Sequence, residues 1–221
     1  MSNIVAPTFD RHALVRRGRW LSAATLAYNS LEGVLATVIG LSTGSVALVG
    51  FGVDSGIEVS ASVVALWRLA ADAEPSRRAR VERIGHRSIG CLFLALAVYI
   101  AYDGVKALLG HEAPEASISG ILLAVASLVV MPYLAREKRR VGSALGSRAL
   151  IAESAQTSLC MYLSAILLGG LLLNGLVGWW WSDPVAALLM VPIIAREGIE
   201  GLRGEPSCSD GCVDPRPAEV R

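Results

Sequence analysis

The feature that most constrains this chain is a series of six apolar blocks. Each block approaches or exceeds the ~20 residues that an α-helix needs to cross a bilayer. The fourth is the clearest, with no charged residue from Ile118 to Ala135. The blocks cover roughly residues 20–41, 44–69, 88–109, 117–134, 149–175 and 183–202. Because they make the chain 53% hydrophobic, the sequence predicts an all-α membrane protein and excludes a soluble enzyme.

The connections between the blocks alternate in charge. The N-terminal arm, the second connection "ADAEPSRRARVERIGHR" and the fourth connection "REKRRVGSALGSR" are rich in Arg and Lys. The odd connections "GLSTGS", "GHEAPEAS" and "GWWWSD" contain neither. Since basic connections stay on the cytoplasmic side, the alternation predicts a bundle of six transmembrane helices with both termini cytoplasmic.

We expect three segments along the chain. Residues 1–19 form a cytoplasmic N-terminal arm, residues 20–203 the transmembrane domain, and residues 204–221 a short disordered cytoplasmic tail. Residues 1–19 are polar and basic, without the apolar core of a secretory signal peptide. We therefore expect a multi-pass protein that lies in the plasma (inner) membrane. Its expected partner is the lipid bilayer, and no nucleic-acid partner is expected.

Two acidic residues interrupt the second block, in the stretch "GFGVDSGIEVS". Asp54 and Glu58 are four residues apart, so they share one face of a helix. At ~1.5 Å per residue they lie ~15 Å and ~21 Å below the outer end of that span. Ionisable residues at this depth are expensive and usually functional, and two neighbouring carboxylates repel each other. Something is expected to compensate their charge.

The first and fifth spans carry polar side chains at overlapping depth. Asn29 and Glu32 share one face of the first span, ~13 Å and ~18 Å above its cytoplasmic end. In the fifth span Glu153, Gln156 and Cys160 form one stripe, and the last two lie ~10 Å and ~16 Å above that end. All three spans therefore bring polar groups to the middle of the membrane.

If the second and fifth spans face each other, Asp54, Glu58, Gln156 and Cys160 can form a four-ligand cage. Carboxylate oxygen and thiolate suit a borderline metal such as Zn²⁺. A divalent cation would neutralise the carboxylates when bound, and protons can do so when it leaves. The metal is then a transported substrate, and no permanently bound cofactor is expected.

Plainer interpretations stay open for several of these residues. Asn29, Thr157 and Ser164 can hydrogen-bond neighbouring helices. Cys160 can be a small packing residue, and Gln156 is a weak ligand for a transition metal. Asp103 and Lys106, three apart in the third span, can neutralise each other. For the acidic pair of the second span we find no alternative that removes its energetic cost.

The tail contains "SCSDGC", which places Cys208 and Cys212 four residues apart. One hypothesis is a site that captures metal and delivers it to the cage; the other is a solvated tail with two reduced thiols. A single pair of cysteines is weak evidence, because a closed zinc site needs about four ligands.

The stretch "GSVALVGFGVDSGIEVSASVVALWR" resembles the second helix of the cation diffusion facilitator family of metal/proton antiporters, with Asp54 and Glu58 at the family's acidic pair. The "SDP" that contains Asp183 and opens the sixth block also resembles the family pattern. The resemblance extends over about Trp20 to Arg203. It implies export of a divalent metal from the cytoplasm by alternating access, coupled to proton entry, with a homodimer through the transmembrane helices as a candidate assembly.

The sequence departs from the family pattern in two places. The fifth helix of the family carries H-x-x-x-D, and Gln156 and Cys160 stand at those positions. We also expect a short branch that lacks the family's cytosolic C-terminal domain. Glu32 and Glu153, with Asn29, are candidates to replace what is lost, as groups that support the ligands or relay protons.

A rival function is a non-transporting membrane protein of the same fold, acting as a metal sensor or interaction scaffold. A membrane enzyme is not expected. The three histidines, His12, His86 and His111, all lie outside the predicted spans, and no nucleophile has a base beside it.

Overall fold

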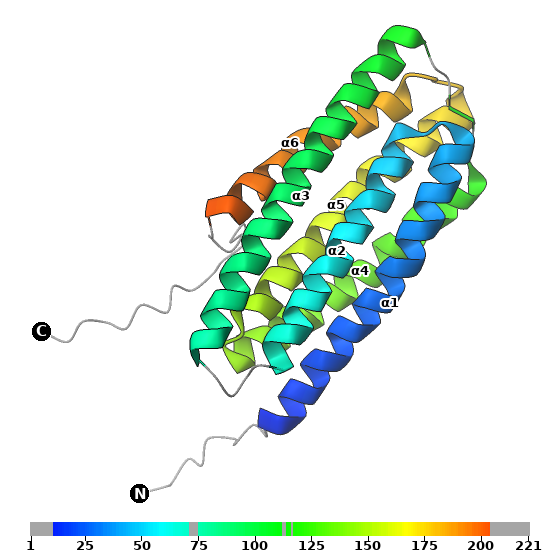
Figure 1. Ribbon diagram of the computed structural model, residues 1–221. Coiled ribbons are helices and arrows are strands. Elements are labelled where there is room, and N and C mark those ends of the chain that lie inside the picture. The colour runs from blue at the N-terminus through cyan, green and yellow to red at the C-terminus, as the bar shows by residue number, and fades with distance from the viewer. Residues whose placement is uncertain (1–10, 71–74, 112–113, 116, 204–221) are drawn as a thin grey trace, which may run out of the picture.

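The computed structural model describes residues 11–70, 75–111, 114–115 and 117–203. Within these ranges the regular secondary structure consists of six α-helices (Figure 1). They are α1 (Arg11–Thr43), α2 (Val46–Ala70), α3 (Pro75–Gly110), α4 (Ile118–Leu145), α5 (Arg148–Val177) and α6 (Ser182–Arg203). The expected all-α bundle of six helices is confirmed.

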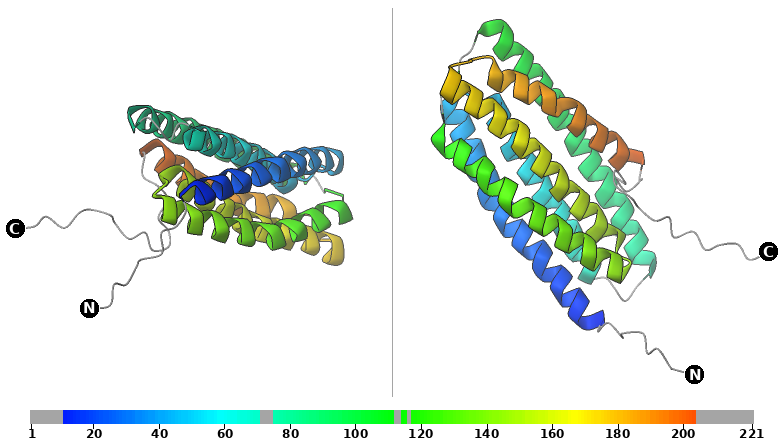
Figure 2. Two further views of the ribbon diagram at one scale, coloured as in Figure 1. Left: turned by 90° about the horizontal axis from the view of Figure 1, so that it is seen from below. Right: turned by 180° about the vertical axis from the view of Figure 1, so that it is seen from behind.

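The helices run alternately up and down and form two layers of three. One layer holds α1, α2 and α3 and the other α4, α5 and α6, as the view from below in Figure 2 shows. Contacts join α1 to α4, α2 to α5, and α3 to α6 across the layers. The second and fifth helices are therefore the central members of their layers, and they face each other as the sequence suggested.

Several helices continue beyond the apolar blocks. The first begins at Arg11, inside the predicted N-terminal arm, and the third begins at Pro75, inside the predicted second connection. The fourth continues to Leu145 through most of the predicted basic connection. The length of an apolar block predicts only the minimum length of its helix. Flanking polar residues with good helix propensity lengthen the helix beyond the block. The predicted tail, residues 204–221 with Cys208 and Cys212, lies outside the described residues.

The turn between α4 and α5 shows why the chain reverses there. Gly146 adopts a left-handed conformation with φ 62°, and its N–H donates to the last carbonyls of α4. The Ser147 hydroxyl then accepts a hydrogen bond from the backbone N–H of Leu150, at 3.4 Å, and so caps α5. Glycine at the end of one helix and serine at the start of the next are typical of a tight helical hairpin.

Five of the described helices are long and apolar enough to cross a membrane: α1, α2, α3, α4 and α5. The sixth has 22 residues, which is sufficient length, but Asp183 at its start and Arg196, Glu197 and Glu200 near its end leave only a short uncharged stretch between them. It packs along part of α3, from about Gly104, beside Leu188, to Gly90, beside Leu202 (Figures 1 and 2). The first residues of α1 and the α4–α5 turn lie at one end, which we call the basic end, and α6 ends short of it.

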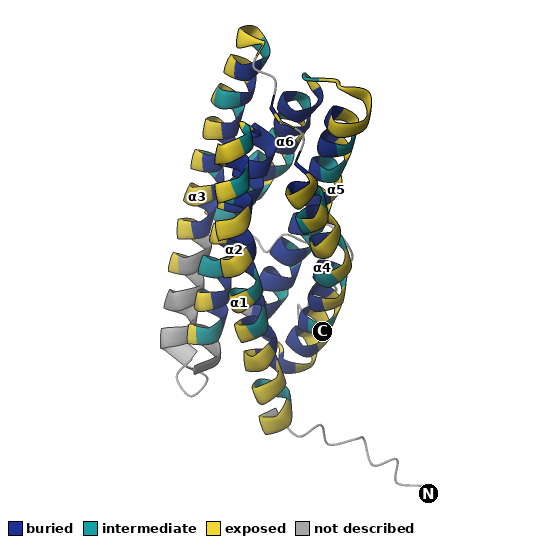
Figure 3. Cartoon of the chain, turned by 90° about the vertical axis from the view of Figure 1, so that its right-hand side faces the viewer, coloured by how far each residue is buried: buried dark blue, intermediate teal, exposed yellow. Residues whose placement is uncertain are grey.

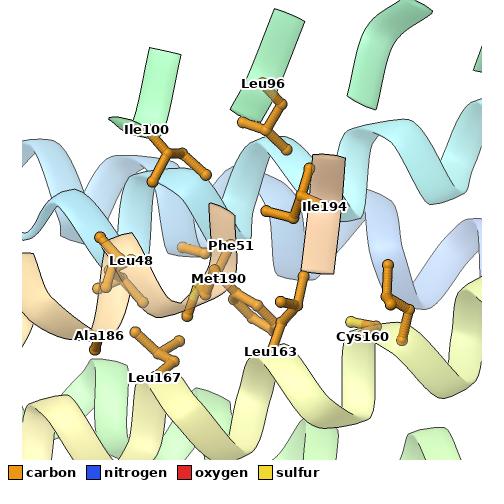
Figure 4. Close-up of a cluster of buried hydrophobic side chains, with 14 of the residues drawn as sticks. Leu48, Phe51, Leu96, Ile100, Cys160, Leu163, Leu167, Ala186, Met190 and Ile194 are labelled. Atoms are coloured by element: carbon orange, nitrogen blue, oxygen red, sulfur yellow. The ribbon is translucent and has the colours of Figure 1, made fainter. Parts of the chain in front are cut away.

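Burial follows the two-layer arrangement. Figure 3 shows buried residues on the helix faces between the layers and exposed residues on the outer faces. The main apolar cluster joins α2, α3, α5 and α6, with Phe51, Ile100, Leu163 and Met190 fully covered (Figure 4). The exposed outer faces are also apolar, and include Val98, Leu122 and Val129 among others. The outer surface is therefore apolar where that of a soluble protein is polar, as expected for a surface in contact with lipid.

Glycines allow α1 and α2 to approach closely. A Cβ added at Gly52 would lie 2.4 Å from Thr37 Oγ1 and 2.7 Å from the Thr37 backbone N. Small residues at such crossings are typical of membrane helices, where close van der Waals packing holds helices together. Gly56, one turn further along α2, would meet nothing within 4 Å.

We expect Gly52→Ala to destabilise the protein by about 1–3 kcal/mol, because the new methyl group must push α1 away from α2. Gly56→Ala is the matched control, on the same helix and with open space around it. It is expected to be neutral or stabilising by up to about 1 kcal/mol, since alanine favours a helix interior. Unfolding in detergent, followed by circular dichroism, measures both; equal effects would contradict the close contact.

Candidate functional site

Asp54 and Glu58 lie where the two layers meet. The central position of α2 buries both side chains, which are 1% and 2% exposed. Their spacing of one helical turn places them on the inner face of α2, as the sequence predicted. Carboxylates in such a position are stable only if donors, protons or a cation satisfy them.

The first helix supplies two polar partners to this face. Asn29 Nδ2 donates a hydrogen bond to Glu58 Oε2, and Ser55 Oγ donates to Glu32 Oε2 at 3.1 Å. The two helices run antiparallel, so Asn29 is level with Glu58 and Glu32 is level with Ser55, next to Asp54. Glu32 is therefore a third buried carboxylate at this level, only 1% exposed.

These partners satisfy only part of the group. Both oxygens of Asp54, Glu58 Oε1, Glu32 Oε1 and Asn29 Oδ1 are buried without a hydrogen-bond partner among the described residues. Gln156 Oε1, on the facing helix, is in the same condition. All of these atoms are acceptors, and leaving them unpaired in a low-dielectric interior is unfavourable. Two hydroxyls in the same condition, those of Tyr28 and Ser127, lie beside Glu32. A cation or protons would satisfy several of the acceptors together.

The facing helix α5 brings Gln156 and Cys160 to this region. Gln156 is 8% exposed and Cys160 is fully buried. The Cys160 thiol lies at the edge of the apolar cluster in Figure 4, and the charges of Glu58, Asp54 and Glu32 act on it. Both predicted roles, packing residue and metal ligand, are therefore compatible with its position.

The carboxylates are neighbours but are not arranged as a closed cage. No three His, Cys, Asp or Glu side chains of the described residues lie close enough together to hold a metal ion. Three like charges are expected to separate in the absence of a counter-charge. The four-ligand cage of Asp54, Glu58, Gln156 and Cys160 therefore remains a hypothesis that requires side-chain movement.

Glu153 has a different environment from the one the sequence suggested. Its Oε1 lies 2.9 Å from Lys138 Nζ and accepts a hydrogen bond from Ser62 at 2.8 Å, while its Oε2 accepts one from Ser22 at 2.6 Å. Lys138 also donates to Thr157 Oγ1 at 2.9 Å. Both charged side chains are almost fully covered, at 0% and 2% exposed. Glu153 is thus already neutralised by a buried cation and does not share the unpaired condition of Asp54.

Asp183, in the "SDP" stretch, connects the starts of two helices at the end opposite the basic end. It is fully buried; its Oδ1 accepts from Ser45 Oγ, and its Oδ2 accepts from the Ala47 backbone N–H at 3.3 Å. A carboxylate at the N-terminus of α2 stabilises the helix through its free N–H groups and its dipole. The structure therefore gives this residue a capping role between α6 and α2.

Sequence reasoning missed two charged residues near the site. The sequence places Lys138 in a basic connection, because Arg136, Arg139 and Arg140 surround it. Glu197 of α6 is half-buried, and its charge acts on Asp54. Helical periodicity offered a weak indication for the first of these, since Lys138 lies on one face with the buried Met131, Leu134 and Val141.

The arrangement of a central acidic pair on α2 opposite α5 agrees with a known family. The model of the cation efflux transmembrane domain matches residues 23–203. The chain belongs to the cation efflux family. This match covers most of the described residues and includes the polar groups of α1, α2 and α5.

Several similar proteins support the same assignment. An uncharacterised transporter of Synechocystis is 30% identical over 152 residues, covering 66% of this chain and 49% of that protein. The magnetosome protein MamB of Paramagnetospirillum magneticum is 28% identical, covering 82% of this chain and 62% of the relative. The cation-efflux pump FieF of Shewanella oneidensis is 23% identical, with 82% and 64% covered. The chain thus spans about half to two thirds of the length of these relatives.

Proposed function

We propose that this chain carries a divalent metal cation across the membrane. One observation carries the proposal: Asp54, Glu58, Glu32 and Asn29 present unpaired buried oxygens at one level of the bundle. Protein interiors rarely leave so many acceptors without donors unless a ligand or protons complete them. Membership of the cation efflux family supports a metal cation as that ligand.

Asp54 and Glu58 are the proposed central ligands. The proposed partner across the layers is α5, through Cys160 and Gln156. Glu32 and Asn29 support the carboxylates from α1. Cation binding would draw these separated groups together, because it replaces the repulsion among the carboxylates by attraction to a common charge. When the cation leaves, protons are the proposed replacement.

We further propose that the transported metal is of the zinc type and moves out of the cytoplasm by alternating access, in exchange for protons. The basic end would face the cytoplasm, since Arg-rich helix ends remain on that side. The plasma (inner) membrane as location and a homodimer through the helices belong to the same proposal. Zinc is favoured by the mixture of carboxylate oxygens with one thiol, which suits a borderline metal.

Flux through proteoliposomes tests the function. Vesicles that hold a metal-sensing dye and a pH dye are exposed to Zn²⁺, Cd²⁺ or Mn²⁺. We expect metal entry above that of protein-free vesicles, accompanied by proton movement in the opposite direction. If Cys160 binds as thiolate, Cys160→Ser slows Cd²⁺ more than Mn²⁺, because thiolate prefers softer cations.

The outcomes separate the alternatives. Metal flux without proton movement would remove the coupling from the proposal and keep the transporter. No flux of any cation by folded protein would favour the sensor or scaffold. An equal loss for both metals in Cys160→Ser would make Cys160 a packing residue.

A further inference from the structure

A buried ion pair lies between the proposed metal ligands and the basic end. Lys138 and Glu153 contact each other at 2.9 Å, and in the described part of the chain Lys138 is the one basic side chain that is buried. The proposed function leaves this pair without a role. A buried pair costs desolvation energy that an apolar pair of the same volume would not, so its presence calls for an explanation.

The position of the pair relative to the ligands follows from its hydrogen bonds. Glu153 Oε1 accepts from Ser62, which lies one helical turn from Glu58 on the same face of α2, toward the basic end. The pair is therefore about 5 Å, one turn, from the level of Glu58. Lys138 is close enough for its charge to act on the Glu58 carboxylate.

The group joins four helices at this level. Ser22 comes from α1, Ser62 from α2, Lys138 from α4, and Glu153 with Thr157 from α5. The side chains of these five residues are buried. Together they fill the centre of the bundle between the two layers, on the side of the carboxylates that leads to the basic end.

We propose that Lys138, seated on Glu153 and surrounded by the hydroxyls of Ser22, Ser62 and Thr157, is a gate that closes the route from the basic end to the metal ligands. This inference rests on the proposed function. A cation that approaches from that end meets a fixed ammonium group on the carboxylate in its path. Loading of the site requires Lys138 and Glu153 to separate, after which Glu153 faces the entering cation.

Charge gives the gate a property that apolar packing lacks. While the pair is closed, the ammonium occupies the Glu153 carboxylate, so an entering cation cannot bind there. Once the pair has opened, the hydroxyls of α1, α2 and α5 supply polar partners for both separated charges. An ion pair among hydroxyls can therefore separate at a lower energetic cost than one in an apolar interior, as a gate needs.

Cys160 provides a reporter that does not depend on transport. It is fully buried, and it lies three residues beyond Thr157 on α5, on the far side of the gate from the basic end. A protein with Cys91, Cys208 and Cys212 replaced by Ser keeps it as the single thiol. A membrane-impermeant maleimide is added to sealed vesicles from the side of the basic end, and the rate of labelling of Cys160 is measured.

We expect Lys138→Gln to raise that rate about tenfold or more, because the neutral amide no longer holds the closed population. Lys138→Arg, which keeps the charge, and the exchanged pair Lys138→Glu with Glu153→Lys should label nearly as slowly as the parent. Labelling from the opposite side should not change in any of them. A folded Lys138→Gln protein that labels at the parental rate, or an arginine variant as fast as the glutamine variant, would overturn the gate.

A milder variant decides the matter if Lys138→Gln does not fold. Thr157→Val keeps both charges and the volume but removes a 2.9 Å acceptor from Lys138. It should increase labelling several-fold, and an unchanged rate overturns the proposal. The labelling and flux experiments can fail separately. If the parent labels slowly, Lys138→Gln labels faster and no metal flux is seen, the gate is kept and the transporter is removed. If metal flux is present but no variant changes the labelling rate, the transporter is kept and the gate is removed.

Discussion

Replacing Asp54 with Asn is expected to reduce metal flux by at least about a hundredfold, because loss of a group that merely supports a metal ligand already costs 10–100-fold in metal affinity or activity. Asp54 would contribute two oxygens, both without a hydrogen-bond partner among the described residues. The amide has the same shape but no charge, so it removes half of the acidic pair. Glu58→Gln is expected to act in the same way.

The stability of these variants should move in the opposite direction from their activity. An ionised carboxylate without donors is unfavourable in the interior, and a neutral amide lowers that cost. We therefore expect the melting temperature of Asp54→Asn to equal or exceed that of the wild type. Such a separation, with flux lost and stability kept, is typical of residues that serve function at the expense of stability.

Asp103→Asn is the matched control for the flux assay. Asp103 is also an acidic residue within a long apolar helix, but it lies on α3 and its carboxylate accepts a hydrogen bond from Tyr99 at 3.4 Å. Its flux should remain close to that of the wild type. Near-normal flux in Asp54→Asn would remove Asp54 from the proposed ligands.

The largest effect on stability is expected for Lys138→Met, which should destabilise the protein by about 3–5 kcal/mol because it leaves the Glu153 charge buried and unpaired. Glu153→Leu should be similarly harmful, since it strands the lysine. The double variant should recover most of the loss, because an apolar pair of comparable volume replaces both charges without a desolvation cost. Unfolding in detergent, analysed as a double-mutant cycle, measures the coupling.

Arg17 and Glu137 provide an exposed pair for comparison. Their side chains are 54% and 17% exposed, and Arg17 Nη2 contacts Glu137 Oε2. Solvent screening limits the contribution of such a pair, so Arg17→Ala should cost less than about 1 kcal/mol. If Lys138→Met were as mild as Arg17→Ala, the Lys138–Glu153 pair would not be the buried interaction that we describe.

The sequence alone predicted the helices and part of the site. Apolar blocks of spanning length and the alternating charge of their connections indicated six antiparallel helices, because both are local properties of the chain. The same local periodicity placed Asp54 with Glu58 on one face of α2, and Asn29 with Glu32 on one face of α1. Their burial and mutual proximity follow once these faces turn inward, as all four side chains do.

Tertiary structure decided which polar residues are satisfied and which are not. In the sequence, Lys138 does not differ from the arginines around it. In the structure it is buried, because α4 extends beyond its apolar block and packs against α5. As a result Glu153 pairs with Lys138, and Asp183 accepts a hydrogen bond at the start of α2. Both contacts join residues from different helices. Asp54 has no hydrogen-bond donor among the described residues. Such pairings depend on which helices are neighbours and at what register, and no local pattern of residues encodes either.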